Sequence, residues 1–328
     1  MKYKTIDSKR ALKWCFLGCG NITKSHAKAL SNLKDNIELS FASRSIDKAK
    51  SYKDTLNGVQ AFGNYNEAIQ SDEVDVIMIN TPPNSHFDLA KSGLENGKHV
   101  VVEKPPFFKS SDFDVLGKLA DDNGLQLIVA ENYFYKPLRY KIESLLQSKI
   151  IGDPLFLHIN ATKKQASKND WREDKSITGF GALFEGGIHW INFINHLGFE
   201  ITDISGLVPG PKKELERSIQ VTANTSEGLV MNLQYSWEVD TLFKGLRISR
   251  ILGSEGSITF ESNGVFYFAR GQGKKFAFPD LLNISGQKKM LTDFVTSIRA
   301  GHPPQFDWKM AQNDLKLIET IYSSINRG

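Results

Sequence analysis

The feature that most constrains the fold is a glycine turn near the start of the chain, Gly18-Cys19-Gly20. Apolar residues precede it at positions 14–17, as in a short buried strand, and residues 22–33 follow it with the spacing of an amphipathic helix. Glycines let the backbone turn tightly and approach a ligand, and the first N–H groups of the helix can bind an anion. This order predicts the pyrophosphate site of a dinucleotide. The usual third small residue is replaced by Thr23, so a plain turn without a ligand is the alternative.

The composition is that of a soluble globular protein, because 40% of the 328 residues are hydrophobic and 24% are charged. A chain of this length is expected to form about two domains. The net charge of +4 and the lack of a dense Lys/Arg block argue against nucleic acid as a partner. Cys15 and Cys19 are too far apart on extended chain for a disulfide, and their spacing predicts no metal site. No signal peptide and no apolar run of roughly 20 residues is present, which predicts a cytoplasmic protein outside the membrane.

The first half of the chain alternates apolar strands with amphipathic helices. After the first helix, strands are predicted at residues 37–42, 75–80, 99–103 and 125–130, with short connections to the helices between them. Such alternation predicts parallel βαβ units, and their ligands bind outside the carboxyl ends of the strands. The glycine turn and three further distinctive segments follow strands directly: Ser43-Arg44, Thr81-Pro82-Pro83 and Glu103-Lys104-Pro105. We therefore expect a Rossmann domain, a doubly wound parallel sheet, over residues 1–133.

The end of the second predicted strand bears on the choice of coenzyme. An acidic residue about 20 positions after the glycines receives the ribose hydroxyls in NAD sites, whereas an Arg suits a 2′-phosphate. This chain has Ser43 and Arg44 there, and both can hold a phosphate. We predict NADP or NAD as the cofactor, with NADP favoured; an ordinary solvated Arg44 is the alternative.

Three motifs occur together: the glycine turn, residues 80–86 (Asn-Thr-Pro-Pro-Asn-Ser-His) and residues 97–105 (Gly-Lys-His-Val-Val-Val-Glu-Lys-Pro). This combination resembles the glucose–fructose oxidoreductase / inositol dehydrogenase / MocA (Gfo/Idh/MocA) family, and the resemblance covers nearly the whole chain. Members are mostly NAD(P)-dependent oxidoreductases of sugars, cyclitols and related hydroxyl or carbonyl compounds. The resemblance implies that Lys104 is the active-site lysine, which donates to the substrate oxygen beside the nicotinamide.

Physical arguments support a special role for Lys104. A lysine just past a buried strand and held by a proline is expected to be partly desolvated, which lowers its pKa. An exposed loop lysine is the alternative. The expected cofactor contacts come from all four strand ends, with a structural cap as the alternative for His86: Gly18, Gly20, Asn21, Ile22, Ser43, Arg44, Thr81, Pro82, Asn84, His86, Glu103 and Lys104.

The second half has the pattern of an α+β domain over residues 134–328. Strands are predicted around residues 155–161, 220–224, 229–239, 246–252, 257–261 and 265–269, joined by turns such as Asn263-Gly264. They predict a large, mostly antiparallel open sheet with helices on one face, and amphipathic helices at 287–300 and 309–325 are expected to close this domain. An aromatic-bearing face is either an oligomer surface or core packing: Tyr235, Trp237, Phe266 and Phe268. A homo-oligomer, dimer or tetramer, is expected through this sheet.

A glycine-bearing helical pattern over residues 183–197 carries the remaining candidate catalytic residues. Glu185 and His189 are four residues apart, so they share a helix face, and a carboxylate beside an imidazole suits proton transfer near neutral pH. The family pattern here is Leu-x-Asp-x-Gly-x-His-x-x-Asp, which aligns Gly187 and His189 but puts Glu185 and Asn192 in place of the two Asp residues. The resemblance implies that His189 is a general acid/base or substrate ligand. A core histidine is the alternative, and the longer Glu185 must place its carboxylate differently.

Trp171-Arg172 resembles a segment that borders the substrate pocket in relatives. Trp can stack on a ring and Arg can anchor a carboxylate or hydroxyls, although a surface loop explains the pair equally well. The predicted catalytic residues are Lys104, His189 and Glu185, and the predicted substrate contacts add Trp171 and Arg172 to these three.

The sequence thus predicts a two-domain NAD(P)-dependent dehydrogenase or reductase acting on CH–OH groups, with a small sugar-like or polyol-like substrate in the cleft between domains. Hydride would pass between the substrate carbon and the nicotinamide, while Lys104 and His189 manage the proton and the developing alkoxide. The alternatives are a non-catalytic NAD(P)-binding regulator, a glycosidase of the same fold that uses NAD transiently, and an interaction protein that binds no dinucleotide.

Overall fold

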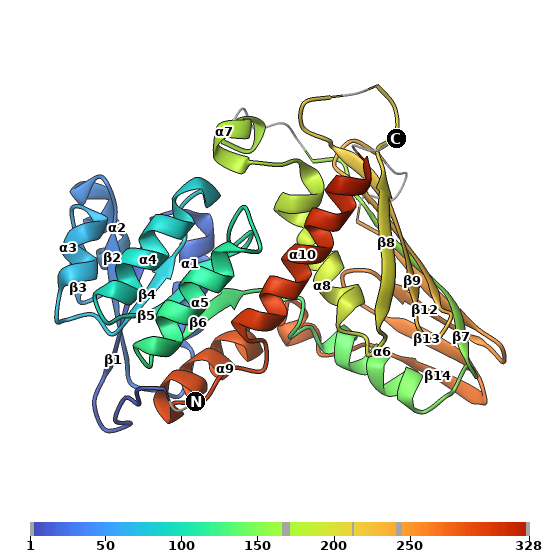
Figure 1. The fold of residues 1–328 in the computed structure, drawn as a ribbon. Helices are drawn as coiled ribbons and strands as arrows, with labels where there is room; N and C mark the ends of the chain where they lie inside the picture. The colour runs from blue at the N-terminus through green and yellow to red at the C-terminus, as the bar shows by residue number, and fades with distance from the viewer. Residues whose placement is uncertain (1–2, 166–170, 212, 241–244, 326–328) are drawn as a thin grey trace. The chain divides into compact units, whose positions relative to one another are not determined.

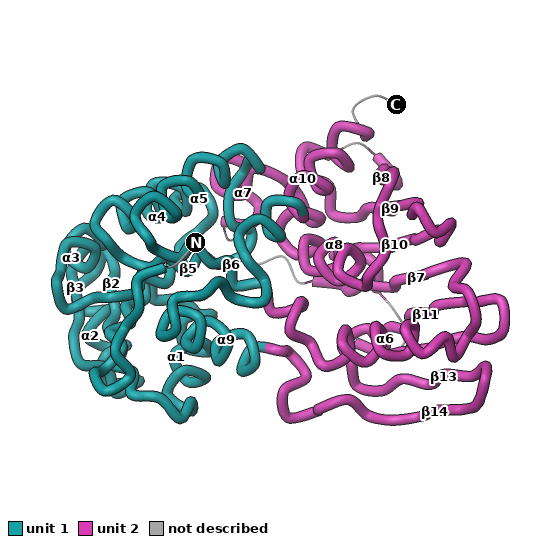
Figure 2. Tube along the Cα trace, turned by 60° about the horizontal axis from the view of Figure 1, so that its bottom comes forward, with its two compact units in different colours: residues 1–131, 287–313 teal, residues 132–286, 314–328 magenta. Residues whose placement is uncertain are grey.

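The computed structural model describes residues 3–165, 171–211, 213–240 and 245–325, which form two compact units. Unit 1 contains residues 1–131 and 287–313, and unit 2 contains residues 132–286 and 314–328 (Figure 2). No helix among the described residues is long and apolar enough to cross a membrane.

Unit 1 is built on a parallel sheet of six strands in the order β3-β2-β1-β4-β5-β6 (Figure 1). Its strands are β1 (Leu12–Leu17), β2 (Ile37–Ala42), β3 (Gln60–Phe62), β4 (Val76–Ile79), β5 (His99–Glu103) and β6 (Leu127–Ala130). Its helices are α1 (Asn21–Ser31), α2 (Ile46–Thr55), α3 (Tyr65–Gln70), α4 (His86–Glu95), α5 (Asp112–Asp122), α9 (Gln287–Ala300) and the first residues of α10 (Trp308–Ile325).

The central strands are mostly apolar because helices cover both faces of the sheet. Every residue of β4 and of β5 is buried. Helices α4 and α5 lie on one side of the sheet, and α1 and α9 lie on the other (Figure 2). The strand order places β1 and β4 side by side at the centre, so the glycine turn after β1 adjoins the loop after β4. The predicted Rossmann sheet is confirmed, and the short edge strand β3 was not predicted.

The helix over residues 287–300 belongs to unit 1, so the expectation that it closes the second domain is wrong. Its buried face packs against unit 1, and the amide of Gln126 next to β6 donates to the carbonyls of Ser297 and His302. Amphipathic periodicity shows that a helix has a buried face but not which sheet it covers.

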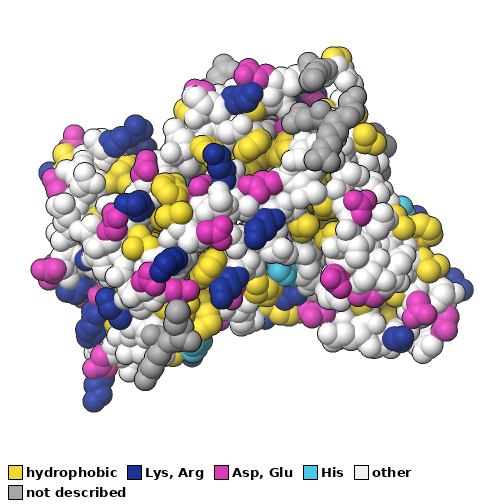
Figure 3. Space-filling model, in the orientation of Figure 1, with side chains coloured by type: hydrophobic (Ala, Val, Ile, Leu, Met, Phe, Trp, Pro, Cys, Tyr) yellow, Lys and Arg dark blue, Asp and Glu magenta, His cyan; other side chains and the backbone are white. Residues whose placement is uncertain are grey.

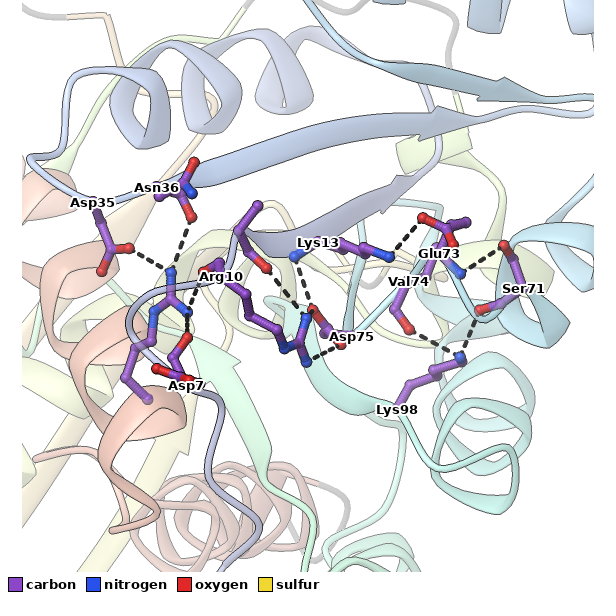
Figure 4. Close-up of polar contacts among 12 residues, drawn as sticks. Asp7, Arg10, Lys13, Asp35, Asn36, Ser71, Glu73, Val74, Asp75 and Lys98 are labelled. Atoms are coloured by element: carbon purple, nitrogen blue, oxygen red, sulfur yellow. Dashed lines mark hydrogen bonds and ion pairs between the residues drawn. The ribbon is translucent and has the colours of Figure 1, made fainter.

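The amino-terminal edge of the parallel sheet is held by a network of ion pairs and hydrogen bonds (Figure 4). Arg10 makes a bidentate pair with Asp75, at 2.8 Å for each oxygen, and the backbone N–H of Lys13 also donates to this carboxylate. Arg299 from α9 donates to Asp35 and to the carbonyl of Asn36 at the start of β2. These contacts tie the start of β1 to β2, β4 and α9.

Unit 2 contains an eight-stranded sheet in the order β14-β13-β12-β11-β7-β10-β9-β8. Its strands are β7 (Pro154–Thr162), β8 (Ile201–Leu207), β9 (Ser218–Thr225), β10 (Val230–Ser236), β11 (Ile248–Gly253), β12 (Ser257–Glu261), β13 (Tyr267–Gly271) and β14 (Gly273–Ala277). Its helices are α6 (Pro137–Gln147), α7 (Lys175–Thr178), α8 (Ile188–Asn195) and the remainder of α10.

Most strand pairs of this sheet are antiparallel, as predicted, but β7 and β10 pair in parallel and make the sheet mixed. The two edge strands, β8 and β14, were not predicted. In β14 four of the five residues are exposed and the fifth is half-buried, so the strand carries little hydrophobic signal.

Side chains alternate between a covered face and an open face of the unit 2 sheet. Tyr235 and Trp237 are buried, and the indole N–H of Trp237 donates to the Tyr235 hydroxyl at 2.9 Å. Phe268 instead faces Phe276 across β13 and β14, and both rings are exposed. The predicted aromatic face is therefore divided: Tyr235 and Trp237 pack in the core, and Phe268 lies on the open face.

Charged side chains of both signs are interspersed over the face of the molecule drawn in Figure 3, with no extended region of a single sign.

Candidate active site

The glycine turn joins β1 to α1, and each glycine has its own reason to lack a side chain. Gly18 has a φ of 105°, and a Cβ there would lie 3.0 Å from the carbonyl oxygen of Asn80. Gly20 has ordinary extended backbone, and a Cβ there would meet no atom within 4 Å. Gly18 therefore serves the turn, whereas the space in front of Gly20 is left open.

No side chain among the described residues caps the N-terminus of α1, where the N-cap is Gly20, and its first turn contains no acidic residue. The first N–H groups of a helix need acceptors from outside the helix, and they favour an anion. Asn21 and Ile22 lie at this end and are exposed. An open approach over Gly20 and unsatisfied N–H donors fit a pyrophosphate group.

Thr23 explains how the turn departs from the usual glycine pattern. Its hydroxyl donates to the carbonyl of Gly18 at 2.6 Å and accepts from the side-chain amide of Asn80 at 2.9 Å. The buried Thr23 thus ties the turn to the end of β4. The side-chain oxygen of Asn80 is buried and has no partner among the described residues, which leaves an acceptor beside the turn. Sequence reasoning had not assigned roles to these two residues.

The end of β2 carries Ser43, Arg44 and Ser45 and no carboxylate. The Ser43 hydroxyl accepts from the backbone N–H of Ser45 at 3.3 Å, and Arg44 is exposed. Burial raises the pKa of Tyr65, while the nearby Arg44 guanidinium opposes that rise and hydrogen bonds to the phenol. Burial raises the pKa of the Cys19 thiol to about 11, and the charge of Lys48, in the first turn of α2, opposes this rise. Lys48 therefore lies close to Cys19. Two cations therefore lie near the glycine turn and the end of β2.

The loop after β4 is fastened to the loop after β5 through His86. The His86 ring is 1% exposed, with Nε2 2.8 Å from the carbonyl oxygen of Thr81 and Nδ1 3.0 Å from that of Pro105. Burial lowers the pKa of His86. The ring thus links two strand ends, which is the structural role that the sequence left open as the alternative. Thr81 and Pro82 are half-buried, Asn84 is exposed, and all three lie on the loop after β4.

Glu103 and Lys104 lie at the carboxyl end of β5. The Glu103 carboxylate is 2.5 Å from Nε2 of His26 through one oxygen and accepts the backbone N–H of Lys104 at 3.1 Å through the other. Burial raises the pKa of Glu103, but the hydrogen bond from His26, together with Lys104, outweighs burial and leaves the pKa below its usual value. Lys104 itself is half-buried. Both oxygens of Glu103 are therefore engaged within unit 1.

In unit 2, Glu185 lies in a π-helical turn, Leu183–Gly187, which leads directly into α8. Such turns are frequent at functional sites because they redirect side chains that a regular helix would stack. Glu185 is 9% exposed as a residue, and its carboxylate accepts from Nε of Arg172 at 3.1 Å. The guanidinium of Arg172 lies 4.6 Å from the ring centre of Trp171. The structure thus brings together three predicted site residues from two segments, Trp171, Arg172 and Glu185.

The backbone of Gly186 is in close contact with the unit 2 sheet. A Cβ at Gly186 would lie 2.1 Å from the hydroxyl oxygen of Tyr235, so a larger residue would have to displace that hydroxyl. Burial raises the pKa of Tyr235 far above its ordinary range, and the negative charge of Glu185 adds to the rise. Tyr235 therefore stays a neutral phenol beside the Glu185 turn.

The turn is also held from its other side by Glu216 and Tyr322. One oxygen of Glu216 accepts from the backbone N–H of Leu183 at 2.9 Å and from the Tyr322 hydroxyl at 2.7 Å. Burial raises the pKa of Glu216, although these hydrogen bonds oppose the rise. The turn that carries Glu185 is thus anchored at its first residue.

His189 follows on α8 and stacks on Tyr133, which precedes α6. The ammonium of Lys136 lies 4.0 Å from the centre of the Tyr133 ring, and Trp190 meets that ring edge-on. Tyr133, Tyr235 and Glu216 were not among the predicted site residues. The available signal was Tyr133-Phe134-Tyr135, a run of aromatic residues where the chain enters unit 2.

Two family models match consecutive parts of the chain. Residues 12–131 match the oxidoreductase family with an NAD-binding Rossmann fold, and residues 140–259 match the GFO/IDH/MocA C-terminal domain. Together they cover most of both units, so the chain belongs to the Gfo/Idh/MocA family of oxidoreductases. The predicted family is confirmed, and so is the predicted class of enzyme.

Individual relatives extend over most of the chain. Oxidoreductase P35 of Formosa agariphila is 25% identical over 261 residues, which are 76% of this chain and 79% of that protein. The dTDP-3,4-didehydro-2,6-dideoxy-alpha-D-glucose 3-reductase of Streptomyces violaceoruber is 26% identical over 267 residues, covering 78% and 74% of the two chains.

Solved structures share the fold over nearly the full length. A levoglucosan dehydrogenase in complex with NADH and levoglucosan superimposes with a TM-score of 0.86 at 18% identity, covering 97% of this chain and 98% of that one. KijD10, a 3-ketoreductase of Actinomadura kijaniata in complex with NADP and TDP-benzene, gives a TM-score of 0.85 at 18% identity, with coverage of 96% and 98%. These likenesses confirm the α/β fold with its second, mixed sheet.

Proposed function

We propose that this protein is an NAD(P)-dependent dehydrogenase or reductase that transfers a hydride between the nicotinamide and a hydroxyl or carbonyl carbon of a sugar, cyclitol or related small molecule. The observation that carries the proposal is the open, uncapped glycine turn at Gly20, which shares the carboxyl edge of one sheet with Lys104. When bound, the nicotinamide supplies or accepts the hydride.

The residues of unit 1 have distinct roles in this proposal. The N–H groups at Asn21 and Ile22 bind the pyrophosphate, since no side chain satisfies that end of α1. Lys104 binds the reacting oxygen of the substrate and stabilises the alkoxide that develops there as the hydride leaves or arrives. Thr81, Pro82 and Asn84 border the coenzyme from the loop after β4.

Unit 2 supplies the substrate ligands. His189 acts as general acid/base or as a ligand of the hydroxyl, and its stacking on Tyr133 holds the imidazole plane in place. The Glu185 carboxylate, held by Arg172, accepts hydrogen bonds from further hydroxyls, and Trp171 offers a flat face to a sugar ring. The two relatives with named sugar compounds, the dTDP-sugar reductase and the levoglucosan dehydrogenase, support this class of substrate.

NADP is the favoured coenzyme. The end of β2 presents Ser43 and Arg44 without a carboxylate, and Lys48 adds a second cation near the glycine turn. A 2′-phosphate is stabilised by such donors, whereas ribose hydroxyls are usually received by an acid. Solved relatives hold either NADH or NADP, so the choice depends on these side chains of the present chain.

We further propose a homo-oligomer formed through the open face of the unit 2 sheet. Exposed apolar side chains on this face include Phe156, Leu252, Phe268 and Phe276. An exposed apolar face of this kind is typical of a protein–protein interface. Sedimentation equilibrium of the wild type and of Phe268→Asp tests this: a wild-type monomer would contradict the proposal. The alternatives of a regulator or a transient-NAD glycosidase gain no support from the relatives.

The deciding experiment compares Lys104→Ala with Lys109→Ala, a control at an exposed lysine five residues away. After coenzyme titrations, both variants are assayed with a panel of sugars and polyols. Lys104→Ala is expected to lower kcat by at least about a hundredfold while coenzyme binding stays nearly intact, because the lysine acts on the substrate oxygen. Lys109→Ala should behave as the wild type. Equal activity of the two variants would contradict the role of Lys104, and failure to bind either coenzyme would contradict the whole proposal.

A further inference from the structure

Gln287, the first residue of α9, contacts two neighbouring residues of α1 that lie far from it in the sequence. Its side-chain oxygen accepts from the Ser25 hydroxyl at 3.0 Å, and its side-chain nitrogen donates to Nδ1 of His26 at 2.9 Å. In the structure the amide oxygen faces the Ser25 hydroxyl and the amide nitrogen faces Nδ1 of His26; because an amide nitrogen can only donate, Nδ1 accepts. His26 is 2% exposed, and water therefore does not compete for its ring nitrogens.

The orientation of Gln287 sets the tautomer of His26. Because Nδ1 accepts a hydrogen bond, the ring proton is on Nε2, which lies 2.5 Å from the carboxylate of Glu103. The other oxygen of Glu103 accepts the backbone N–H of Lys104. A directional chain of hydrogen bonds thus runs from Gln287 through His26 and Glu103 to the peptide that carries Lys104, and every member belongs to unit 1.

We propose that Gln287 and His26 are positioning residues for the active-site lysine: they fix one tautomer of a buried imidazole, which holds the Glu103 carboxylate against the Lys104 peptide. This inference rests on the proposed function of Lys104. The opposite tautomer would place a bare ring nitrogen against the carboxylate, so Glu103 would lose its donor and release the Lys104 N–H.

Three titratable or charged groups lie near the Glu103 carboxylate. His26 faces it from α1, and Lys104 follows it in the chain. His86 lies near it from the start of α4, and burial keeps that imidazole neutral by lowering its pKa. A buried carboxylate needs such donors, because an unpaired one carries the full cost of desolvation.

Two substitutions at Gln287 separate the tautomer from mere packing. Gln287→Leu removes the donor to Nδ1, and Gln287→Glu replaces it with an acceptor, which favours a proton on Nδ1 as well. The helix surface supplies a control, Thr292→Ala, at an exposed position of the same helix. Each protein is labelled with ¹⁵N-histidine, and the ring nitrogens of His26, assigned with His26→Gln, are recorded by NMR across the neutral pH range.

The wild type and Thr292→Ala are expected to show a non-protonated Nδ1 and a protonated Nε2. Gln287→Glu should show both nitrogens protonated, and Gln287→Leu a mixture of tautomers. Gln287→Leu should lose about tenfold in kcat, the effect of one hydrogen bond to a charged group, with coenzyme Kd within about twofold. Gln287→Glu keeps a proton on Nε2 against Glu103, so its kcat should stay within about twofold of the wild type. A protonated Nδ1 in the wild type, or an unchanged kcat in Gln287→Leu once its tautomer has changed, would overturn the inference. The NMR result does not depend on turnover, so it is distinguishable from a failure of Lys104→Ala to reduce activity.

Discussion

Tyr133 stacks on His189, with ring centroids 4.5 Å apart and ring planes 13° from parallel. The Lys136 ammonium lies over the Tyr133 ring at 4.0 Å, and Trp190 contacts the same ring at its edge. The proposed acid/base histidine is therefore held by an aromatic platform that is itself held by two neighbours. This arrangement restricts rotation of the imidazole, and a general acid/base needs such a fixed orientation toward its substrate.

The platform makes a prediction for substitutions of Tyr133. Tyr133→Phe keeps the stacked ring and should retain most of the activity, whereas Tyr133→Leu removes the ring and should lower kcat by up to about tenfold, the size of an aromatic pair energy. The check is kcat and KM for both variants, together with melting temperatures. Equal losses in the two variants would show that the hydroxyl and not the ring is important.

Gly20 allows a test of coenzyme binding that does not disturb folding. A Cβ at Gly20 meets nothing within 4 Å and the backbone is extended, so Gly20→Ala is expected to fold with a melting temperature within about 2 °C of the wild type. The added methyl group occupies the approach of the pyrophosphate, and the coenzyme Kd should rise at least about tenfold. Fluorescence titration measures this. Gly186→Ala is the matched contrast, because its Cβ would overlap the Tyr235 hydroxyl and destabilise the fold. If Gly20→Ala binds the coenzyme as tightly as the wild type, the pyrophosphate does not bind at this turn.

Arg44 should distinguish the two coenzymes. Arg44→Ala is expected to raise the Kd for NADPH by at least about tenfold, because a charge-assisted contact with the 2′-phosphate is lost, and to leave the Kd for NADH within about twofold. Lys50→Ala, an exposed lysine on α2, controls for the change in net charge. A wild type that prefers NADH, or an equal effect on both coenzymes, would contradict the assignment.

The lowered pKa of Asp75 predicts how the free energy of unfolding changes in acid. Burial raises its pKa, but the bidentate bond from Arg10 and the N–H of Lys13 outweigh burial, so the pKa is lower in the folded protein than in the unfolded chain. A carboxylate with a depressed folded pKa stabilises the protein fully above its unfolded pKa of about 3.9 and loses this contribution as pH falls through the folded pKa. Urea midpoints measured between about pH 7 and pH 2.5 should therefore depend less on pH in Asp75→Asn than in the wild type. Asp72→Asn, at an exposed neighbour, should retain the wild-type slope; an unchanged slope in Asp75→Asn would show that the Arg10 pair contributes nothing.

Local patterns predicted the elements whose signal lies within one short segment. The strand, glycine turn and helix around Gly18, the buried β4 and β5, and the six inner strands of the second sheet were visible as apolar runs or alternations bounded by turns. The edge strands β8 and β14 were not predicted because edge strands expose many of their side chains and show only weak hydrophobic alternation. In the sequence, Thr23 departs from the usual glycine motif. Only the hydrogen bonds of its hydroxyl with Gly18 and Asn80 show that it stabilises the turn.

The candidate site was only partly accessible from sequence. Glu185 and Arg172 were proposed separately, and the bond between them became visible only in the structure. Three residues around the site lie far from the π-helical turn in the sequence, and no spacing rule links them to it: Tyr133, Tyr235 and Glu216. Their roles depend on which faces meet after folding.

The sequence alone determined the inner strands of both sheets, the glycine turn and the position of Lys104 after a buried strand, because these depend on residues adjacent in the chain. Only the tertiary structure decided that α9 packs in unit 1, that β7 and β10 run in parallel, and that Gln287 reaches His26 from 261 positions away. Hydrophobic periodicity defines which side of an element is buried. The partner it is buried against is chosen by the packing of the whole chain.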